Sequence, residues 1–458
     1  MARAQTITGG RDATVAVIPG RYALSVGLPN LPAPDGWSWT PLSSVARLES
    51  GHTPSRRHPE YWGGSVPWIG IRDATGNHGR VIHETIEYTN ELGIENSSAR
   101  VLPKDTVCLS RTASVGYVVV MGRPMSTSQD FVNWICSEKL NPHFLKYILL
   151  AERESLLIFA VGSVHQTIYF PEAKAFHICM PDRRTQDSIV EVLGALDDKI
   201  ELNQRMNETL EATARAIFKD WFVDFGPTRA KMEGRAPYLG PDIWSLFPGS
   251  LDGEDKPEGW SAGSLFDIAC LNPESWSRAT YPEAVDYVDL SNTKWGTIET
   301  ITHYASEAAP SRAQRILRPG DTIVGTVRPG NGSYAYVSAQ GLTGSTGFAV
   351  LRPKSRIFRE VVYLAATAKE NIDRLTHLAD GGAYPAVRPE LVAATELVAA
   401  PESFFAAFSA ATSALIDRAE ANKLENRVLA ATRDLLLPKL MSGEIRVREA
   451  EKAVKVAG

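Results

Sequence analysis

A long segment near the middle of the chain repeats apolar residues with the period of a helix that packs against another helix. Alternating steps of four and three residues connect Ile189, Leu193, Leu196, Ile200, Asn203, Asn207, Leu210, Ala214, Ile217 and Trp221. All but the two asparagines are apolar, and an apolar repeat of this kind over roughly four heptads is typical of a coiled-coil seam. The pattern predicts a central long helix over 186–225, in which residues 189–221 would span roughly 50 Å.

The same pattern recurs near the C-terminus, shifted by the 219 residues that separate Asn203 from Asn422. The second seam consists of Phe408, Thr412, Leu415, Ala419, Asn422, Asn426, Leu429, Arg433, Leu436 and Leu440. It predicts a second long helix over 401–441, whose regular part runs from about residue 402 to 437 and is ended by Pro438, because proline ends helices. We expect the two helices to form an antiparallel coiled coil that spaces the domains on either side.

Both helices carry an asparagine pair at the same seam positions. Asn203 and Asn207 in the first helix correspond to Asn422 and Asn426 in the second. A buried asparagine lowers stability but fixes the register when it can bond to an asparagine opposite. The alternative is that the seam is locally wet and the asparagines face water. The recurrence in one register favours pairing.

The rest of the chain is repeated as well. Gly36-Trp37-Ser38 returns as Gly259-Trp260-Ser261, and Asp105-Thr106-Val107 returns as Asp321-Thr322-Ile323. A period this long describes two copies of a domain plus a helix rather than a solenoid. The sequence therefore predicts an α+β fold with two similar mixed α/β domains, two long helices and an internal pseudo-two-fold symmetry.

Composition changes along the chain suggest the boundaries. We expect an N-terminal extension over 1–35, which lies over the first domain or is partly disordered, and a first domain over 36–185. A linker rich in glycine and proline over 226–258 follows the central helix, and a second domain covers 259–400. Residues 442–458 form a tail. Within the first domain, a single helix is predicted over Pro142–Phe159.

Charge and cysteine content narrow the function classes. The net charge is −5, and residues 36–185 contain 15 Lys and Arg against 14 Asp and Glu, so any contact with DNA must come from local clusters. The four cysteines are far apart and form no metal-binding spacing, so no metal is expected. No uncharged apolar run reaches the length of a membrane span, and we expect a soluble cytoplasmic protein with no membrane partner.

Catalytic motifs are missing from the sequence. An adenine methyltransferase needs an Asn/Asp-Pro-Pro-aromatic loop, and the nearest segments, at Asn141-Pro142 and Asn272-Pro273, lack the second proline. Neither a glycine-rich nucleotide turn nor a phosphate loop is present. We therefore expect a non-catalytic protein without cofactors.

Several motifs resemble the specificity subunit of type I restriction–modification enzymes. The strongest is the segment from Leu435 to Val447, which contains Pro438 and Ser442-Gly443 and is similar to that family's closing motif. Phe218-Lys-Asp-Trp-Phe222 and Gly51-His-Thr-Pro54 are similar as well, although the latter has no counterpart after Ala269. The resemblance covers about 36 to 447.

This resemblance implies two target-recognition domains, each of which reads half of a split sequence in double-stranded DNA. It also implies that the helices set the separation and dock two methyltransferase subunits, which restriction/translocase subunits then join. Residues 186–224 contain four Lys and Arg against nine Asp and Glu, which repels phosphate and favours a protein partner for that helix.

Polar loops that follow β-like segments are the candidates for base contact. Arginine and lysine suit guanine, asparagine and glutamine suit adenine, and hydroxyl groups suit either. The candidates are Arg72, Arg111, Thr112, Ser114 and Gln166 in the first domain, and Lys294, Arg328, Asn331, Ser333 and Tyr384 in the second. The loop around Gln166 begins at Gly162. Arg111 and Arg328 each follow the repeated Asp-Thr-Val/Ile strand, although ordinary hairpin turns explain Gly, Ser and Asn equally well.

A different function class also fits the pattern. The chain could be a non-enzymatic scaffold whose coiled coil spaces two protein-binding modules. Sequence-specific binding of a duplex, measured on the chain together with a methyltransferase, distinguishes the two hypotheses.

Overall fold

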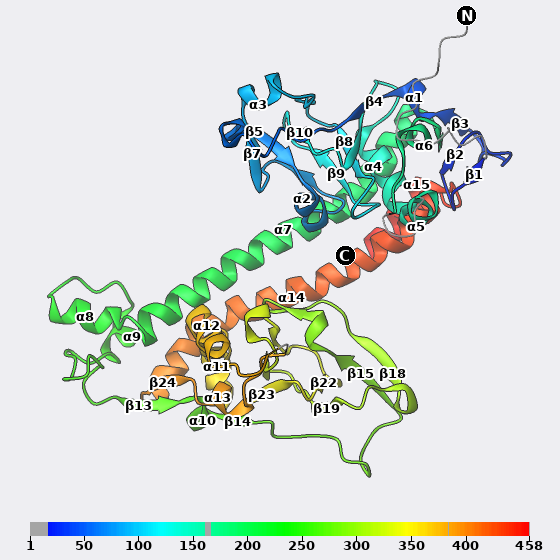
Figure 1. Cartoon of the computed structure of the whole chain (residues 1–458). Helices are drawn as coiled ribbons and strands as arrows, with labels where there is room; N and C mark the ends of the chain where they lie inside the picture. The colour runs from blue at the N-terminus through cyan, green and yellow to red at the C-terminus, as the bar shows by residue number, and fades with distance from the viewer. Residues whose placement is uncertain (1–16, 161–165, 383, 458) are drawn as a thin grey trace, which may run out of the picture. The chain divides into compact units, whose positions relative to one another are not determined.

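The structure is a computed structural model that describes residues 17–160, 166–382 and 384–457 (Figure 1). Contacts divide the chain into two compact units. The first unit holds the chain up to residue 200 and from residue 427 onward, and the second unit holds residues 201–426. Both points at which the chain passes from one unit to the other lie inside the long helices α7 (Arg183–Phe222) and α14 (Glu402–Met441).

The main sheet of the first unit has the order β4-β11-β8-β9-β6, in which only the β6–β9 pair is parallel. Two further sheets have the orders β1-β2-β12-β3 and β10-β5-β7. The strands are β1 (Ile18–Pro19), β2 (Leu24–Val26), β3 (Ser38–Pro41), β4 (Ala46–Ser50), β5 (Trp62–Ile69), β6 (Val81–Ile82), β7 (Glu87–Thr89), β8 (Val107–Ser110), β9 (Val118–Met121), β10 (Ser126–Thr127), β11 (Phe131–Cys136) and β12 (Phe176–Met180).

Short helices complete the first unit. They are α1 (Leu42–Val45), α2 (Ile71–Gly76), α3 (Glu91–Glu95), α4 (Pro142–Ala151), α5 (Arg153–Phe159), α6 (Phe170–Lys174) and α15 (Val447–Ala457), with the 3-10 turn η1 (Pro59–Tyr61). Helix α4 begins where the sequence predicts, because Asn141 caps it and proline occupies its first turn. The side-chain oxygen of Asn141 accepts a hydrogen bond from the His143 N–H at 2.8 Å.

The second unit repeats the strand order of the first. Its main sheet is β14-β23-β20-β21, which matches β4-β11-β8-β9 strand for strand. The parallel pair β15–β22 matches the parallel pair β5–β10, and the ribbon β13–β24 matches β3–β12. The strands are β13 (Ser261–Ser264), β14 (Ala269–Leu271), β15 (Ala284–Val288), β16 (Thr293–Lys294), β17 (Thr297–Ile298), β18 (Thr302–Ala305), β19 (Ala313–Ile316), β20 (Thr322–Gly325), β21 (Tyr334–Tyr336), β22 (Leu342–Ser345), β23 (Phe348–Pro353) and β24 (Glu396–Ala399).

The helices of the second unit are also short, apart from its portions of α7 and α14. They are α8 (Gly226–Met232), α9 (Pro241–Ser245), α10 (Leu265–Ile268), α11 (Arg359–Ala366), α12 (Lys369–His377) and α13 (Pro389–Ala393). The 3-10 turns are η2 (Leu290–Asn292), η3 (Ser306–Ala308), η4 (Pro329–Asn331) and η5 (Arg356–Phe358). The predicted fold class is confirmed: two similar mixed α/β domains are combined with two long helices.

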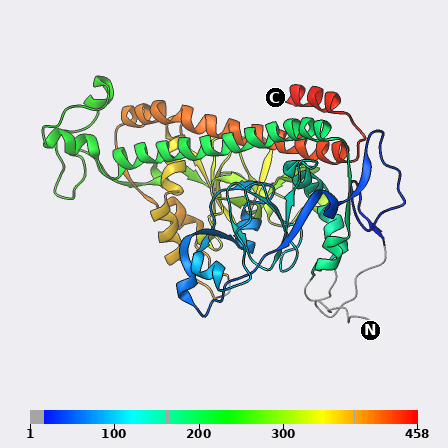
Figure 2. The same ribbon diagram turned by 90° about the horizontal axis from the view of Figure 1, so that it is seen from above.

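Helices α7 and α14 lie side by side and antiparallel (Figure 2). In the second unit, Asn203 donates to the Asn426 side-chain oxygen at 2.9 Å, and Asn422 donates to that of Asn207 at 2.8 Å. Asn203 also donates to Glu425 at 2.8 Å. The amides therefore bond across the seam, and Asn203, Asn207 and Asn422 are buried rather than facing water.

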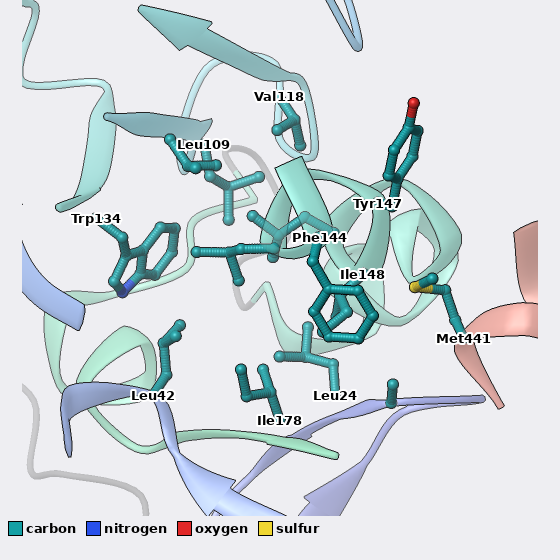
Figure 3. Close-up of a cluster of buried hydrophobic side chains, with 14 of the residues drawn as sticks. Leu24, Leu42, Leu109, Val118, Trp134, Phe144, Tyr147, Ile148, Ile178 and Met441 are labelled. Atoms are coloured by element: carbon teal, nitrogen blue, oxygen red, sulfur yellow. The ribbon is translucent and has the colours of Figure 1, made fainter. Parts of the chain in front are cut away.

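The core of the first unit joins distant parts of the chain (Figure 3). Leu24 of β2, Trp134 of β11, Phe144 of α4 and Met441 of α14 are all at most 1% exposed. Ala450 of α15 is fully buried in the same cluster. The described part of the N-terminal extension and the C-terminal tail are thus built into this core.

The regular part of helix α14 does not stop before Pro438. It continues through Pro438 to Met441, although proline lacks the N–H of a helical hydrogen bond. Leu440 and Met441 are 1% exposed, and burial of these side chains stabilises the last turn. The Ser442 N–H still bonds to the Pro438 carbonyl at 2.9 Å.

The single helix predicted over Pro142–Phe159 is wrong, because the structure has α4 and α5 with a break at Glu152. The Glu152 carboxylate accepts hydrogen bonds from the backbone N–H groups of Arg21, Tyr22, Ala23 and Leu24. This tertiary contact involves residues more than 120 positions away, so no local pattern could reveal it.

The segment expected to be a linker also contributes to a core. Residues 226–258 contain α8 and α9, and Phe247 packs with Trp221, Trp260 and Phe404 in the second unit. The Phe247 ring lies edge-on to the Trp221 ring, with centroids 5.3 Å apart. Aromatic burial explains why a segment rich in glycine and proline is ordered here.

Candidate nucleic-acid interface

Equivalent loops follow the equivalent strands β8 and β20. Arg111 comes directly after β8, and Arg328 lies three residues beyond β20. The Arg111 carbonyl accepts from the Ile168 N–H at 2.8 Å, and the Arg328 N–H donates to the Pro385 carbonyl at 2.7 Å. Each arginine is therefore held between the strand-end loop and a second, distant loop.

The first-unit loop contains the predicted residues Arg111, Thr112 and Ser114, and the predicted residue Gln166 precedes Thr167 on the segment opposite. Arg111 is half-buried, and its Nε donates to the Gln129 carbonyl at 3.1 Å. Burial lowers the pKa of the Arg111 guanidinium, and the nearby Asp130 opposes this effect. The Thr112 and Thr167 hydroxyls are 2.9 Å apart.

Ser114 is half-buried in the same loop, whereas Gln166 is exposed at the end of the described part of the opposite segment. The Ser114 N–H donates to the Thr112 carbonyl at 2.7 Å. The beginning of that opposite loop, Gly162–His165, lies outside the described residues. Arg72 comes from a different element, the first turn of α2, where its side chain is exposed.

Two residues beside Arg111, Thr53 and Gln129, were not predicted from the sequence. The Thr53 hydroxyl bonds to the Gln129 side chain, which places the Gly51-His-Thr-Pro54 segment next to this loop. A Cβ at Gly51 would lie 1.9 Å from the Ser128 carbonyl oxygen, so only glycine allows this close approach. The motif itself was the available signal, because it combines a glycine with a hydroxyl residue.

The second-unit loop presents a cation on an aromatic ring. Arg328 adopts the left-handed conformation with φ 49°, and its guanidinium lies 4.8 Å from the centroid of the Tyr384 ring. Tyr384 is 73% exposed, and Asn331 is exposed on the following turn. Lys294, on β16, is also exposed. The loop thus offers a guanidinium, an amide and a phenol to an external ligand.

Ser333 does not present its hydroxyl in the same way. The residue is buried, and its Oγ donates to the Leu290 carbonyl at 3.0 Å. Because this bond lies inside the loop, the hydroxyl stabilises the loop rather than facing outward. We therefore remove Ser333 from the candidate contact residues.

Ion pairs join each α/β layer to its portion of the helices. In the first unit, Asp197 of α7 accepts from Tyr147 at 2.7 Å and from Arg433 at 3.0 Å, and Lys146 lies 3.2 Å away. Burial opposes ionisation of Asp197, but Lys146, Tyr147 and Arg433 outweigh it and lower its pKa. In the second unit, the Arg359 guanidinium contacts Asp417 of α14 at 3.0 Å. These contacts hold the loop-bearing layers against the helices.

Other kinds of site find little support within the described ranges. No group of three or more His, Cys, Asp or Glu side chains there could hold a metal ion. In the same part of the chain, no helix is both long and apolar enough to cross a membrane.

Comparison with known proteins shows which proteins this chain is similar to. Residues 34–212 match the type I restriction modification DNA specificity domain. The MjaIX specificity subunit of Methanocaldococcus jannaschii, a type I restriction enzyme subunit, is 26% identical over 91% of this chain and 95% of its own length. The HindI specificity subunit of Haemophilus influenzae is 25% identical over 71% of this chain and 84% of its own length.

A solved structure has the same fold. The crystal structure of the type I restriction–modification S subunit from M. genitalium superposes with a TM-score of 0.55 at 15% identity, covering 88% of this chain and 96% of that chain. By its domain match, its relatives and its fold, this chain resembles the specificity subunits of type I restriction–modification enzymes.

Proposed function

We propose that this chain is the sequence-specific DNA-recognition subunit of a type I restriction–modification complex. The observation that carries the proposal is the repetition of one sheet order in two units, with an arginine after the same strand in each. Two copies of one domain suit a target with two half-sites. Arginine is also the commonest side chain in specific contacts to guanine.

Recognition would come from the loops at the ends of β8 and β20, the segments opposite them, Arg72 of α2 and Lys294 of β16. In the first unit we assign base or phosphate contact to Arg72, Arg111, Thr112, Ser114 and Gln166. In the second unit we assign it to Lys294, Arg328, Asn331 and Tyr384. Phosphate contacts position a protein and base contacts specify the sequence, so this set is expected to contain both kinds.

Methylation and cleavage would belong to partner subunits. The absence of an Asn/Asp-Pro-Pro-aromatic loop and of nucleotide-binding motifs from the sequence supports a non-catalytic role. We propose two methyltransferase subunits, one for each half of the repeat, and restriction/translocase subunits that join this core. All of these partners act on DNA in the cytoplasm.

The helices are the proposed docking surface for the methyltransferases. Leu424, Val428 and Leu435 lie along α14 at helical spacing and are 61%, 43% and 61% exposed. Exposed apolar residues in such a row are typical of a protein interface. The neighbouring helix α7 is acidic, which disfavours DNA beside this row.

A domain exchange tests the proposal. Residues 36–185 would be replaced with the equivalent region of a relative, and the methylated motif of a host carrying the complex would be mapped by sequencing. One half of the motif should change while the other half stays the same. A change in both halves, or in neither, would contradict separate recognition by the two units.

The scaffold hypothesis makes a different prediction. If the units bind proteins instead of DNA, the chain co-expressed with its methyltransferase should bind a duplex with the mapped motif no better than a scrambled duplex. Binding measured at several salt concentrations separates specific from non-specific affinity.

A further inference from the structure

Trp295 is an exposed indole in an unfavourable backbone conformation. Its side chain is 61% exposed, and its φ is 47°, in the left-handed region. Together with Gly296, which has φ 85°, it forms the two-residue turn between β16 and β17. Such turns favour Asn-Gly or Asp-Gly, because a bulky residue at positive φ is strained. Folding of the turn therefore does not explain why a tryptophan stands here.

The turn is held rigidly from below. The Trp295 N–H donates to the Gly332 carbonyl at 2.7 Å, and the Gly296 N–H donates to the Tyr334 carbonyl at 2.9 Å. The Gly296 carbonyl accepts from Lys423 of α14 at 2.9 Å. A side chain at Gly296 would approach the Tyr363 hydroxyl to 2.9 Å, so the glycine is needed.

Lys423 is itself fixed by charge. Its ammonium donates to Glu211 at 3.0 Å and to Glu420 at 2.9 Å, and the side chain is only 13% exposed. Burial alone would lower the pKa of Lys423, but Glu420, Tyr363 and Glu211 outweigh burial and raise it. A buried, fully paired ammonium keeps its geometry, so the turn has a firm support on the helix pair.

One side of the indole is covered by the loop that follows β20. A Cβ at Gly332 would lie 2.6 Å from atoms of the Trp295 ring, so the ring rests on the glycine backbone. The Tyr334 ring meets the indole edge-on, with centroids 6.0 Å apart. The rest of the indole is exposed beside two residues assigned above to DNA contact, Lys294 in the same hairpin and Asn331 next to Gly332.

We propose that Trp295 is an aromatic wedge that inserts at a base step of the half-site bound by the second unit, with Lys294 on an adjacent phosphate. Rigid apolar side chains perform this role in proteins that deform DNA, and aromatic rings stack on bases irrespective of sequence. Strain in a turn and exposure of an indole are both unfavourable for the free protein. Such locally unfavourable conformations are common at functional sites. This inference rests on the proposed function of the second unit.

The test uses the full chain in complex with its methyltransferase and a duplex containing the mapped motif. 2-Aminopurine is placed at successive positions of each half-site, because its fluorescence changes when its stacking partners change. The wild-type complex should change the probe fluorescence at one step of one half-site, and Trp295→Ala should abolish that signal. Trp295→Ala should also weaken binding by about 10- to 100-fold, in line with the loss of one stacked base.

Three variants separate the wedge from a structural role. Trp295→Phe keeps an aromatic ring and should recover part of the fluorescence and affinity. Lys294→Ala should weaken target and non-target duplexes alike and reduce the salt dependence by about one ion. Tyr238→Ala, which removes an aromatic side chain that is 50% exposed outside this cluster, should leave DNA binding unchanged.

The inference and the proposed function fail in different ways. If the wild-type complex does not discriminate the mapped motif from a scrambled duplex, the proposed function fails. If it does, but Trp295→Ala binds as tightly and gives the same fluorescence, the wedge is overturned. Loss of assembly with the methyltransferase in Trp295→Ala, with no probe signal in the wild type, would show that the indole contacts protein.

Discussion

Replacing Glu152 with glutamine should loosen the N-terminal strands from the first unit. The Glu152 side chain is fully buried at the junction of α4 and α5. One carboxylate oxygen accepts from the backbone N–H groups of Tyr22, Ala23 and Leu24 at 2.6, 2.7 and 3.1 Å. The other accepts from the Arg21 N–H at 2.9 Å and from a nearby serine hydroxyl.

The magnitude follows from these bonds. Hydrogen bonds to a charged group contribute roughly 1.5–3 kcal/mol each, and bonds to a neutral group about 1 kcal/mol. In Glu152→Gln, the amide oxygen can still accept from the Tyr22, Ala23 and Leu24 N–H groups, but without the charge. The amide NH₂ then faces the Arg21 N–H, which keeps only the Ser155 hydroxyl, at 3.1 Å, as an acceptor, and loss of a hydrogen bond to a charged group costs about 1.5–3 kcal/mol. Allowing for non-additivity, we expect a loss of about 3–5 kcal/mol.

Hydrogen exchange measures this loss locally. The amides of residues 21–24 should exchange at least roughly 100-fold faster in Glu152→Gln, because each 1.4 kcal/mol is a factor of ten. Glu154→Gln is the matched control, since Glu154 lies on α5, pairs with Arg21 and is 65% exposed. An exposed pair contributes at most about 1 kcal/mol. Equal exchange rates in the two variants would refute the argument that the buried carboxylate anchors this segment.

Three further predictions concern recognition, spacing and pH. Arg111→Ala and Arg328→Ala should each weaken specific binding by about 1–3 kcal/mol and relax the preference for one base, each in a different half-motif. Duplex titration and motif mapping measure both effects, and unchanged affinity and motif would show that other residues make the contacts. Inserting one heptad after Asn203 should lengthen α7 by about 10 Å and increase the distance between the half-motifs by up to about three base pairs. An unchanged distance in an active complex would show that the helix length does not set the spacing of the half-motifs. Burial, with nearby arginines, lowers the pKa of His78 from 6.5 to about 4, and its neutral ring accepts from the Val118 N–H at 3.1 Å. The unfolded chain takes up this proton first, so the contribution of His78 to the stability of the first unit should be complete above about pH 6.5 and fall towards pH 4. Urea titrations should show a loss of at most about 2 kcal/mol after solvent screening. His78→Gln should flatten this pH dependence of stability, and an equally steep pH dependence in the variant would assign the effect to other groups.

The asparagines of the two long helices pair in a crossed arrangement. The two cross-helix amide bonds join Asn203 to Asn426 and Asn207 to Asn422, each between different positions of the repeat. An antiparallel pair of equivalent helices requires this crossed pairing. That the amides select the register, rather than only tolerate it, stays a prediction.

The sequence by itself determined the features that depend on local periodicity and repetition. The helical seam of Leu193, Asn203 and Leu429 is visible because a helix buries every third or fourth residue, whatever it packs against. The repeated segments that begin at Asp105 and Asp321 located equivalent loops, because similar sequences in similar surroundings adopt similar folds. The candidate residues next to these strands followed from the same repetition.

Only the tertiary structure decided which side chains face outward and which segments complete a core. Ser333 looked like a contact residue but bonds to the Leu290 carbonyl, and Trp295 was passed over although its indole is exposed. Glu152 lies at the break between α4 and α5, and its carboxylate accepts from N–H groups in the distant turn between β1 and β2. Such outcomes depend on contacts between residues far apart in the chain, and a pattern of neighbours carries no information about the partner that a hydrogen bond or a buried surface will find.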